Sequence, residues 1–140
     1  MTLELTPIRK AISSLEGVLE RANNTELMSS LDDVTRYGLK SGVIQNFEFT
    51  YELCWKFMKR WLEENLGSSY VDGVSRRELF RLAAESRLIT NVDLWMDYHH
   101  SRNQTSHTYD EVKAQKVFET ANRFVHDAQR LLNAIEIRND

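Results

Sequence analysis

Residues 43–66 read VIQNFEFTYELCWKFMKRWLEENL, and this apolar segment decides the expected fold. Its apolar residues form two adjoining stripes at helical spacing, one beginning at Val43 and the other at Ile44. A helix with so broad an apolar surface contacts more than one neighbour. These neighbours are either all helices of the same chain or include a second subunit, and the periodicity fits both interpretations. The remaining side carries charges at intervals of four, which is typical of ion-paired helix surface: Glu48, Glu52, Lys56 and Arg60.

The sequence before this segment predicts an amphipathic helix followed by a weaker one. Thr6 and Pro7 form a good helix start, with Thr6 as the N-cap and Pro7 at the first helical position. An apolar stripe follows and is interrupted at residues 23–24. A weaker pattern over residues 27–34 predicts a short helix or a continuation of the first, and residues 38–42, which begin and end with Gly, predict the next break.

The sequence after this segment predicts two shorter helices. Residues 67–73 form a polar loop, and residues 75–78 (SRRE) match a capping box that opens a helix ending near Arg87. Residues 90–93 (TNVD) cap the next helix. It is expected to end at about residue 102 or 103.

The last helix has the longest apolar pattern in the chain. Residues 108–111 (TYDE) match a further capping box, and the pattern behind them reaches Ile135. No stretch alternates with period two for long enough to predict a strand. Five Gly and one Pro in 140 residues leave few helix breakers. We therefore predict an all-α single domain over residues 1–140, an up-and-down antiparallel four-helix-type bundle with additional short helices.

The charge balance limits how the protein can bind nucleic acid. Lys and Arg total 18 against 21 Asp and Glu, a net charge of −3, which argues against gripping RNA by bulk charge. Residues 75–87 hold four Arg against two Glu and provide local positive charge. The lone Cys54, the lack of a secretory signal pattern and the lack of a long apolar run predict a cytoplasmic protein with no membrane association.

Residues 95–111, WMDYHHSRNQTSHTYDE, have the composition of a chemical site. They contain three of the four His at an expected junction between helices. Arg102 can bind phosphate oxygens in a bidentate manner, and the N-terminus of the last helix favours a phosphate nearby. His107 can transfer protons at neutral pH. Together these residues suggest metal-free RNA cleavage, in which a ribose 2′-OH attacks the adjacent phosphorus.

Other candidate sites are weaker. An Arg followed by a His after four to six residues is expected about once by chance in a chain of this composition, so the spacing alone indicates nothing. The adjacent His99 and His100 point about 100° apart on a helix and cannot chelate one ion together. Cys54 is expected to be a buried packing residue. We therefore expect no metal site and no cofactor.

Two stretches of the chain resemble a known family. VIQNFEFTYELCWKFMKRWLEE and RNQTSHTYDE are similar to the HEPN-domain proteins formerly called nucleotidyltransferase substrate-binding proteins, the HepT half of the MNT–HEPN toxin–antitoxin pairs. The resemblance extends from the first amphipathic helix to the last. It implies an all-α bundle that forms a homodimer, with two R-x4-6-H motifs meeting at the dimer cleft.

The resemblance also implies roles for four residues. The R-x4-H-x-Y pattern of the family corresponds here to Arg102, His107 and Tyr109, and Asn103 is the polar residue that often follows the Arg. Arg102 would stabilise the scissile phosphate and His107 would transfer protons in a metal-independent endoribonuclease. Tyr109, expected in the first turn of the last helix, would be adenylylated by a cognate minimal nucleotidyltransferase. The attached AMP would block RNA by occupancy and like charge.

Three functions stay open at this point. The first is a homodimeric ribonuclease toxin that acts on RNA and is neutralised by a nucleotidyltransferase partner. The second is a non-catalytic subunit that binds a substrate or nucleotide for a two-component nucleotidyltransferase, and the third is a purely structural helical dimer. The clustering of Arg102, His107 and Tyr109 favours the first function over the third. It does not separate the first from the second, because a phosphate-binding cleft serves both.

Overall fold

The computed structural model describes residues 2–139, and all the regular structure in this range is helical. The predicted all-α fold is thus confirmed. The elements in chain order are α1 (Thr6–Ala22), α2 (Thr25–Ser30), α3 (Asp33–Leu66), α4 (Ser68–Val71), α5 (Arg76–Glu85), α6 (Val92–Gln104), the 3-10 turn η1 (Thr105–His107) and α7 (Glu111–Ile137).

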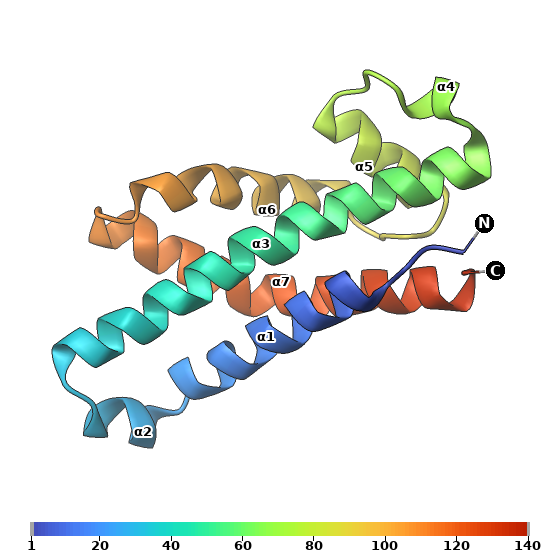
Figure 1. Ribbon diagram of the computed structural model, residues 1–140. Coiled ribbons are helices and arrows are strands. Elements are labelled where there is room, and N and C mark those ends of the chain that lie inside the picture. The colour runs from blue at the N-terminus through green and yellow to red at the C-terminus, as the bar shows by residue number, and fades with distance from the viewer. Residues whose placement is uncertain (1, 140) are drawn as a thin grey trace.

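The four longest helices, α1, α3, α6 and α7, run alternately in opposite directions, as an up-and-down bundle requires (Figure 1). The short helix α2 joins α1 to α3 at one end, and α4 and α5 lie beside the other end of α3. The two ends of the described chain, at Leu3 and Asn139, lie close together. Asn139 ties them, since its side chain accepts a hydrogen bond from the Leu3 amide at 2.8 Å and donates one to the Leu3 carbonyl at 3.0 Å.

An aromatic cluster around Phe124 of α7 joins α3, α6 and α7. The Phe124 ring makes edge-to-face contacts with Phe47 at 5.1 Å, Trp95 at 5.7 Å and Tyr98 at 5.1 Å between ring centroids. All four side chains are buried. Such pairs stabilise by about 0.5–1.5 kcal/mol beyond their area burial. The cluster therefore sets the register of α6 against α3, which positions the polar residues described below.

The broad apolar surface of α3 is accounted for within one chain. Helix α3 packs against α1, α4, α5, α6 and α7. Ten of its residues are buried: Val43, Ile44, Phe47, Thr50, Tyr51, Cys54, Phe57, Met58, Trp61 and Leu62. The large apolar side chain of Phe49 in the same helix remains 54% exposed. A homodimer stays a prediction.

The predicted break between Gly38 and Gly42 is wrong, because α3 runs through both residues without interruption. Its N-terminus is set earlier, where the Asp32 side chain accepts a hydrogen bond from the Thr35 amide at 2.7 Å. A Gly within a helix costs only about 1 kcal/mol relative to Ala. The cap and the strongly packed remainder of α3 together outweigh that cost.

Two predicted helix starts are shifted. Helix α1 begins at Thr6 itself, with Leu5 at the N-cap position and no capping side chain there, while Glu4 accepts a hydrogen bond from the Thr6 amide. Helix α7 begins at Glu111, capped by Asp110 through the amides of residues 112 and 113. Thr108 is not the cap, because it closes the turn η1 in a helical conformation. Tyr109 therefore precedes α7 and does not lie in its first turn.

Two other predicted caps agree with the structure. Ser75 caps α5 by accepting a hydrogen bond from the Glu78 amide at 3.1 Å, and Asn91, within the predicted segment 90–93, caps α6. Helix α6 ends at Gln104, within two residues of the expected position. In the described part of the chain no helix combines the length and apolarity that crossing a membrane requires.

Candidate functional site

The four predicted site residues lie where α6 ends and the chain turns into α7. Arg102 and Asn103 occupy the last turn of α6, His107 ends η1, and Tyr109 follows in the turn before α7. The turn η1 packs against α3, α6 and α7. The site is therefore built on the junction of three long helices.

Arg102 is held by two carboxylates of α3. Its Nε donates to Glu52 at 2.9 Å, and its Nη2 lies 3.8 Å from Glu48. The Arg102 side chain is 30% exposed and the two Glu side chains are 32% and 34% exposed. An ion pair of this exposure adds little stability. Its effect is to fix the plane of the guanidinium.

Thr105 connects η1 to the same carboxylates. Its hydroxyl lies 2.7 Å from the Glu48 side chain and 2.7 Å from the Arg102 carbonyl, so one hydroxyl hydrogen faces two acceptors. The Nη1 of Arg102 reaches the same hydroxyl at 3.5 Å. Because Thr105 and His107 belong to one 3-10 turn, this contact also fixes the start of the segment that carries His107.

His107 and Tyr109 form a second pair. Their ring centroids lie 6.1 Å apart in an edge-to-face arrangement. Tyr109 is 82% exposed and Asn103 is exposed, whereas His107 is partly buried. Within residues 2–139 no hydrogen bond or ion pair joins Arg102 to His107. The fold of one chain brings His107 to Tyr109 and Arg102 to Glu48 and Glu52, as two neighbouring groups.

Tyr51 and His99 form a further polar contact between α3 and α6. The Tyr51 hydroxyl lies 2.8 Å from His99 Nδ1. Burial raises the pKa of Tyr51 and lowers the pKa of His99, and the positive charge of Arg76 lowers the His99 pKa further. We assign Tyr51 as the donor and neutral His99 as the acceptor. The other neighbouring histidine, His100, is exposed.

Sequence reasoning missed the role of Glu48 and Glu52. Their spacing of four predicted ion-paired helix surface, with Lys56 as the partner of Glu52. In the described residues Glu52 instead pairs with Arg102, which is fifty positions away in sequence, and also accepts a hydrogen bond from the Trp55 indole at 2.9 Å. The available signal was that both Glu lie on one face of the helix. No local pattern shows which distant cation reaches that face.

Three further findings concern possible metal ligands, Cys54 and His126. Among residues 2–139 no group of three or more His, Cys, Asp or Glu is placed to hold a metal ion. Cys54 is buried, as predicted, and burial raises the pKa of its thiol. His126 is exposed on α7.

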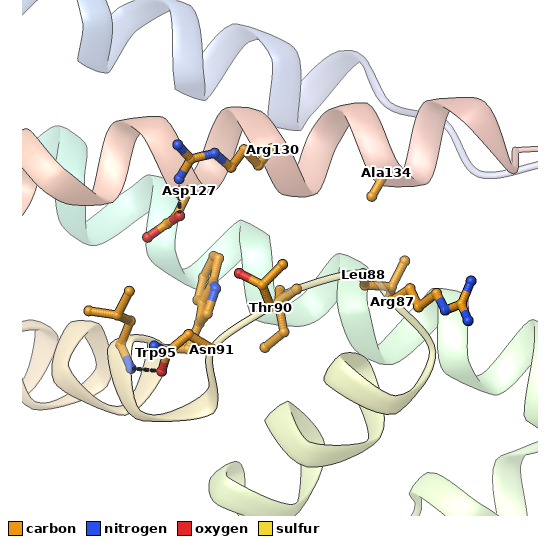
Figure 2. Close-up of a pocket in the computed structure, with 10 residues that line it drawn as sticks. Arg87, Leu88, Thr90, Asn91, Trp95, Asp127, Arg130 and Ala134 are labelled. Carbon is orange, nitrogen blue, oxygen red and sulfur yellow. Dashed lines mark hydrogen bonds and ion pairs between the residues drawn. The ribbon is translucent and has the colours of Figure 1, made fainter.

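A separate hollow lies under the loop between α5 and α6 (Figure 2). It has a volume of about 150 Å³, and Asp127 and Arg130 of α7 line it together with Trp95. Arg130 is paired with Asp127 at 2.8 Å, and Asp127 also accepts a hydrogen bond from Tyr98. None of the four predicted site residues lines this hollow, so it is not part of the candidate site.

Comparison with known sequences identifies a family and a relative of this chain. Residues 3–137 match the model of a family described as nucleotidyltransferase substrate binding protein like. A relative from Haemophilus influenzae, named "Probable ribonuclease HepT", is 31% identical over 138 residues, covering 98% of this chain and 94% of the relative.

Solved structures agree with this relationship. A Haemophilus influenzae structure, described as the fold of a substrate binding domain of a nucleotidyltransferase, has a TM-score of 0.92 and 30% identity over 95% of this chain and 99% of its own. A Thermus thermophilus structure has a TM-score of 0.71 and 26% identity over 90% of this chain and 96% of its own. The sequence resemblance noted above is thus confirmed across the whole fold. The chain belongs to the nucleotidyltransferase substrate binding protein like family, the HEPN-like family to which its sequence pointed.

Proposed function

We propose that this protein is a metal-independent endoribonuclease toxin that acts as a homodimer. A cognate minimal nucleotidyltransferase neutralises it by adenylylating Tyr109. The name of the Haemophilus relative supports the ribonuclease activity, and the family supports association with a nucleotidyltransferase. The observation that carries the proposal is the way Arg102 is held beside the turn that ends in His107.

The contacts of Arg102 leave its terminal nitrogens available to a phosphate. Glu52 takes the Nε hydrogen at 2.9 Å, whereas Nη2 lies 3.8 Å from Glu48, beyond hydrogen-bonding distance. The contact of Nη1 with Thr105, at 3.5 Å, is long. A guanidinium has five N–H donors, and the two terminal nitrogens match a pair of phosphate oxygens. Glu52 therefore orients Arg102 without consuming the edge that would bind RNA.

His107 supplies the proton transfer in the proposed reaction. Its imidazole accepts the proton of a ribose 2′-OH while the 2′ oxygen forms a bond to the adjacent phosphorus. The bond from phosphorus to the 5′ oxygen breaks, and an imidazolium returns a proton to that leaving oxygen. The products are a 2′,3′-cyclic phosphate and a 5′-hydroxyl. In a homodimer the second His107 provides the acid, so that the two protomers together hold both protonation states.

Exposure supports Tyr109 as the adenylylated residue. Of the five Tyr, Tyr51 and Tyr98 are buried with hydrogen-bonded phenols, while Tyr37, Tyr70 and Tyr109 are 67%, 67% and 82% exposed. Among the exposed three, Tyr109 has its ring against His107. An AMP group on this phenol would add a phosphate and a purine beside the proposed proton-transfer residue, which would exclude RNA.

Cleavage of RNA by the purified protein tests the activity. We expect cleavage in the presence of EDTA, a loss of about 10²–10⁴-fold in His107→Ala, and a loss of about 10²–10³-fold in Arg102→Ala. His126→Ala and Arg81→Ala are matched controls, because His126 is exposed and Arg81 is an exposed, ion-paired Arg. Full activity in both site variants would remove the proposed catalytic roles.

Intact-mass measurement tests the neutralisation. Incubation with the nucleotidyltransferase partner and ATP should add the mass of AMP to the wild-type protein and to Tyr70→Phe, but not to Tyr109→Phe. The adenylylated protein should no longer cleave RNA. An unchanged mass of the wild-type protein would contradict the proposed neutralisation and leave the ribonuclease activity standing on its own test.

A non-catalytic nucleotide-binding subunit is the second candidate. The related structure described as a substrate binding domain of a nucleotidyltransferase favours it, as does the local excess of carboxylates around Arg102. This candidate predicts no RNA cleavage by the wild-type protein. It predicts instead that Arg102→Ala weakens binding of a nucleotide measured by calorimetry.

A further inference from the structure

A hollow beside α3 carries positive charge that the proposed reaction does not use. It has a volume of about 240 Å³ and lies where the second half of α3 meets the start of α5. Trp55 and Lys59 of α3 and Ser75 and Arg76 of α5 line it, together with apolar residues of the preceding loop, and no carboxylate is among its lining residues. The volume lies below the range typical of whole-ligand pockets and suits a single phosphate group.

Arg76 is held by a stacking contact and not by a carboxylate. Its guanidinium carbon lies 3.5 Å from the centre of the Trp55 ring. Within the described residues its Nε and Nη1 are buried and have no hydrogen-bond partner. A cation–π contact engages the face of the guanidinium, whereas its N–H groups point outward in the plane and still need acceptors. An anionic ligand in the hollow would supply acceptors to this guanidinium.

In the part of the chain that the structure describes, the other Arg residues of α5 are paired with carboxylates, unlike Arg76. Arg77 is paired with Asp93 at 3.2 Å, and Arg81 is paired with Glu78 at 2.8 Å. Both are well exposed, at 59% and 60% of their side chains. Arg76 has neither a carboxylate partner in the described chain nor that exposure. Lys59 on α3 adds a second cation to the hollow and also lacks an ion pair among residues 2–139.

The hollow is connected to the Arg102 site through one side chain. Trp55 stacks on Arg76 with its ring face and donates from its indole nitrogen to Glu52, which in turn accepts from Arg102 Nε at 2.9 Å. Arg76 and Arg102 also lie near the same imidazole, since the positive charge of each lowers the pKa of His99. The two guanidinium groups are thus neighbours across the Trp55–Glu52 pair.

We propose that Arg76 and Lys59, with Trp55 as one wall, form a second phosphate subsite that holds the backbone of an RNA strand bound at Arg102. This subsite rests on the proposed function, because its ligand is the same RNA. It lengthens the binding site beyond the scissile phosphate and explains how a chain with a net charge of −3 holds a polyanion. A phosphate of a free nucleotide has the same chemistry, and the experiment below separates the two sources.

The test measures RNA binding in a His107→Ala background, where cleavage is expected to be about 10²–10⁴-fold slower. A short fluorescein-labelled single-stranded RNA is titrated by anisotropy at several salt concentrations. Arg76→Gln and Lys59→Gln should each weaken binding by about tenfold and reduce the slope of log K against log salt by about 0.7, as the loss of one phosphate contact requires. Arg77→Gln, which removes the same charge from the same helix, should change neither quantity.

The outcomes are distinguishable from those of the proposed function. If Arg76→Gln and Lys59→Gln bind RNA with the same dependence of log K on log salt as Arg77→Gln, the subsite is overturned. The proposed RNA cleavage by the wild-type protein is not affected by that result. No RNA binding by the His107→Ala parent overturns both. In the last measurement AMP is titrated in place of RNA. If Arg76→Gln weakens the binding of AMP but not the binding of RNA, the assignment of the subsite to RNA is overturned. Lys59→Gln keeps the test valid if Arg76→Gln unfolds, because Lys59 has no ion pair within residues 2–139.

Discussion

Helix α3 is uninterrupted, but its two parts are helical for different reasons. We call residues 33–42 its first or exposed half and residues 43–66 its second or packed half. Residues 33–42 contain no fully buried side chain: Val34 and Tyr37 are 80% and 67% exposed, and Leu39 is partly buried against the core. Residues 43–62 contain all ten buried residues of the helix and pack against the rest of the bundle. The first half is thus stabilised by its cap, by its continuity with the second half and by the partial burial of Leu39, whereas the second half is stabilised by extensive tertiary packing.

The difference also explains where the chemistry lies. Glu48, Glu52 and Trp55 fall between the core positions of the packed half, so their backbone is fixed by buried neighbours. Side chains on such a rigid element can hold Arg102 in one orientation. The exposed half offers no comparable support. The contrast can be tested by substitutions in each half, ordered here from the largest expected effect to the smallest.

Removing a core ring from the packed half should have the largest effect. Phe47 is fully buried against Phe124, so Phe47→Ala should lower the free energy of unfolding by about 3–5 kcal/mol in urea titrations. Phe49→Ala, two positions along the helix on its 54% exposed side, should change it by about 0.5 kcal/mol or less. Equal losses in the two variants would mean that the Phe49 face is covered in the assembled protein.

Removing the cap should affect the exposed half alone. Asp32→Ala should lower the free energy of unfolding and accelerate amide hydrogen exchange in residues 35–39, with exchange beyond residue 43 unchanged. Hydrogen bonds from Thr35 lower the pKa of Asp32 below its ordinary 3.8. The contribution of this carboxylate is therefore present above pH 3.8 and is lost as the pH falls through the lower pKa of the folded state.

Asp32→Asn is the control for this prediction, because Asn is also a good N-cap but does not titrate. It should keep most of the stability and lose the acid sensitivity. Faster exchange throughout α3 in Asp32→Ala would show that the helix unfolds as one unit and would contradict the proposed difference between its halves.

Removing a phenol hydroxyl from each half gives a matched pair. Tyr51→Phe, in the packed half, loses the hydrogen bond to His99 and should cost about 0.5–1.5 kcal/mol. Tyr37→Phe, in the exposed half, should cost close to nothing. Burial lowers the pKa of His99 below its ordinary 6.5, so the folded state favours neutral His99. The wild-type protein should therefore lose stability as the pH falls below 6.5, and an unchanged stability across that range would contradict the assignment.

Filling the two glycines of the exposed half should have the smallest effect, and it should be stabilising. A Cβ at Gly38 or Gly42 would meet no atom within 4 Å. Gly38→Ala and Gly42→Ala should therefore each raise the free energy of unfolding by about 0.5–1 kcal/mol, which a higher midpoint of thermal unfolding would show. Gly67→Ala at the end of α3 should have the opposite sign, because Gly67 has a φ of +99°. A loss of stability in Gly38→Ala would show that this half is covered in the native assembly.

Periodicity and capping chemistry were enough to predict most of the elements. The apolar stripes of residues 43–62 and of α7 have the period of a buried helical face, and Ser75 and Asn91 cap the helices that local chemistry assigned to their segments. The errors arose where two local signals compete. Gly38 and Gly42 disfavour a helix by about 1 kcal/mol each, and that penalty is smaller than the stabilisation from the Asp32 cap and from the packed remainder of α3.

The residue types at the candidate site were also evident in the sequence. Arg102, Asn103, His107 and Tyr109 stand out because charged, titratable and aromatic side chains gather at one helix junction. The spatial arrangement of these residues was not evident in the sequence. The contact between Arg102 and Glu52 joins residues fifty positions apart, and its geometry depends on the register that the Phe124 cluster imposes on α3 and α6.

The sequence by itself therefore determined the all-α class, the apolar face of each long helix and the segment that carries the chemistry. These follow from interactions between residues close in the chain, such as caps and i, i+4 neighbours. Only the tertiary structure decided that Glu48 and Glu52 hold Arg102, that Trp55 stacks on Arg76, and that Tyr109 precedes α7 beside His107. Such contacts depend on how separate helices pack, and a side chain can pair only with a partner that the packing brings within its reach.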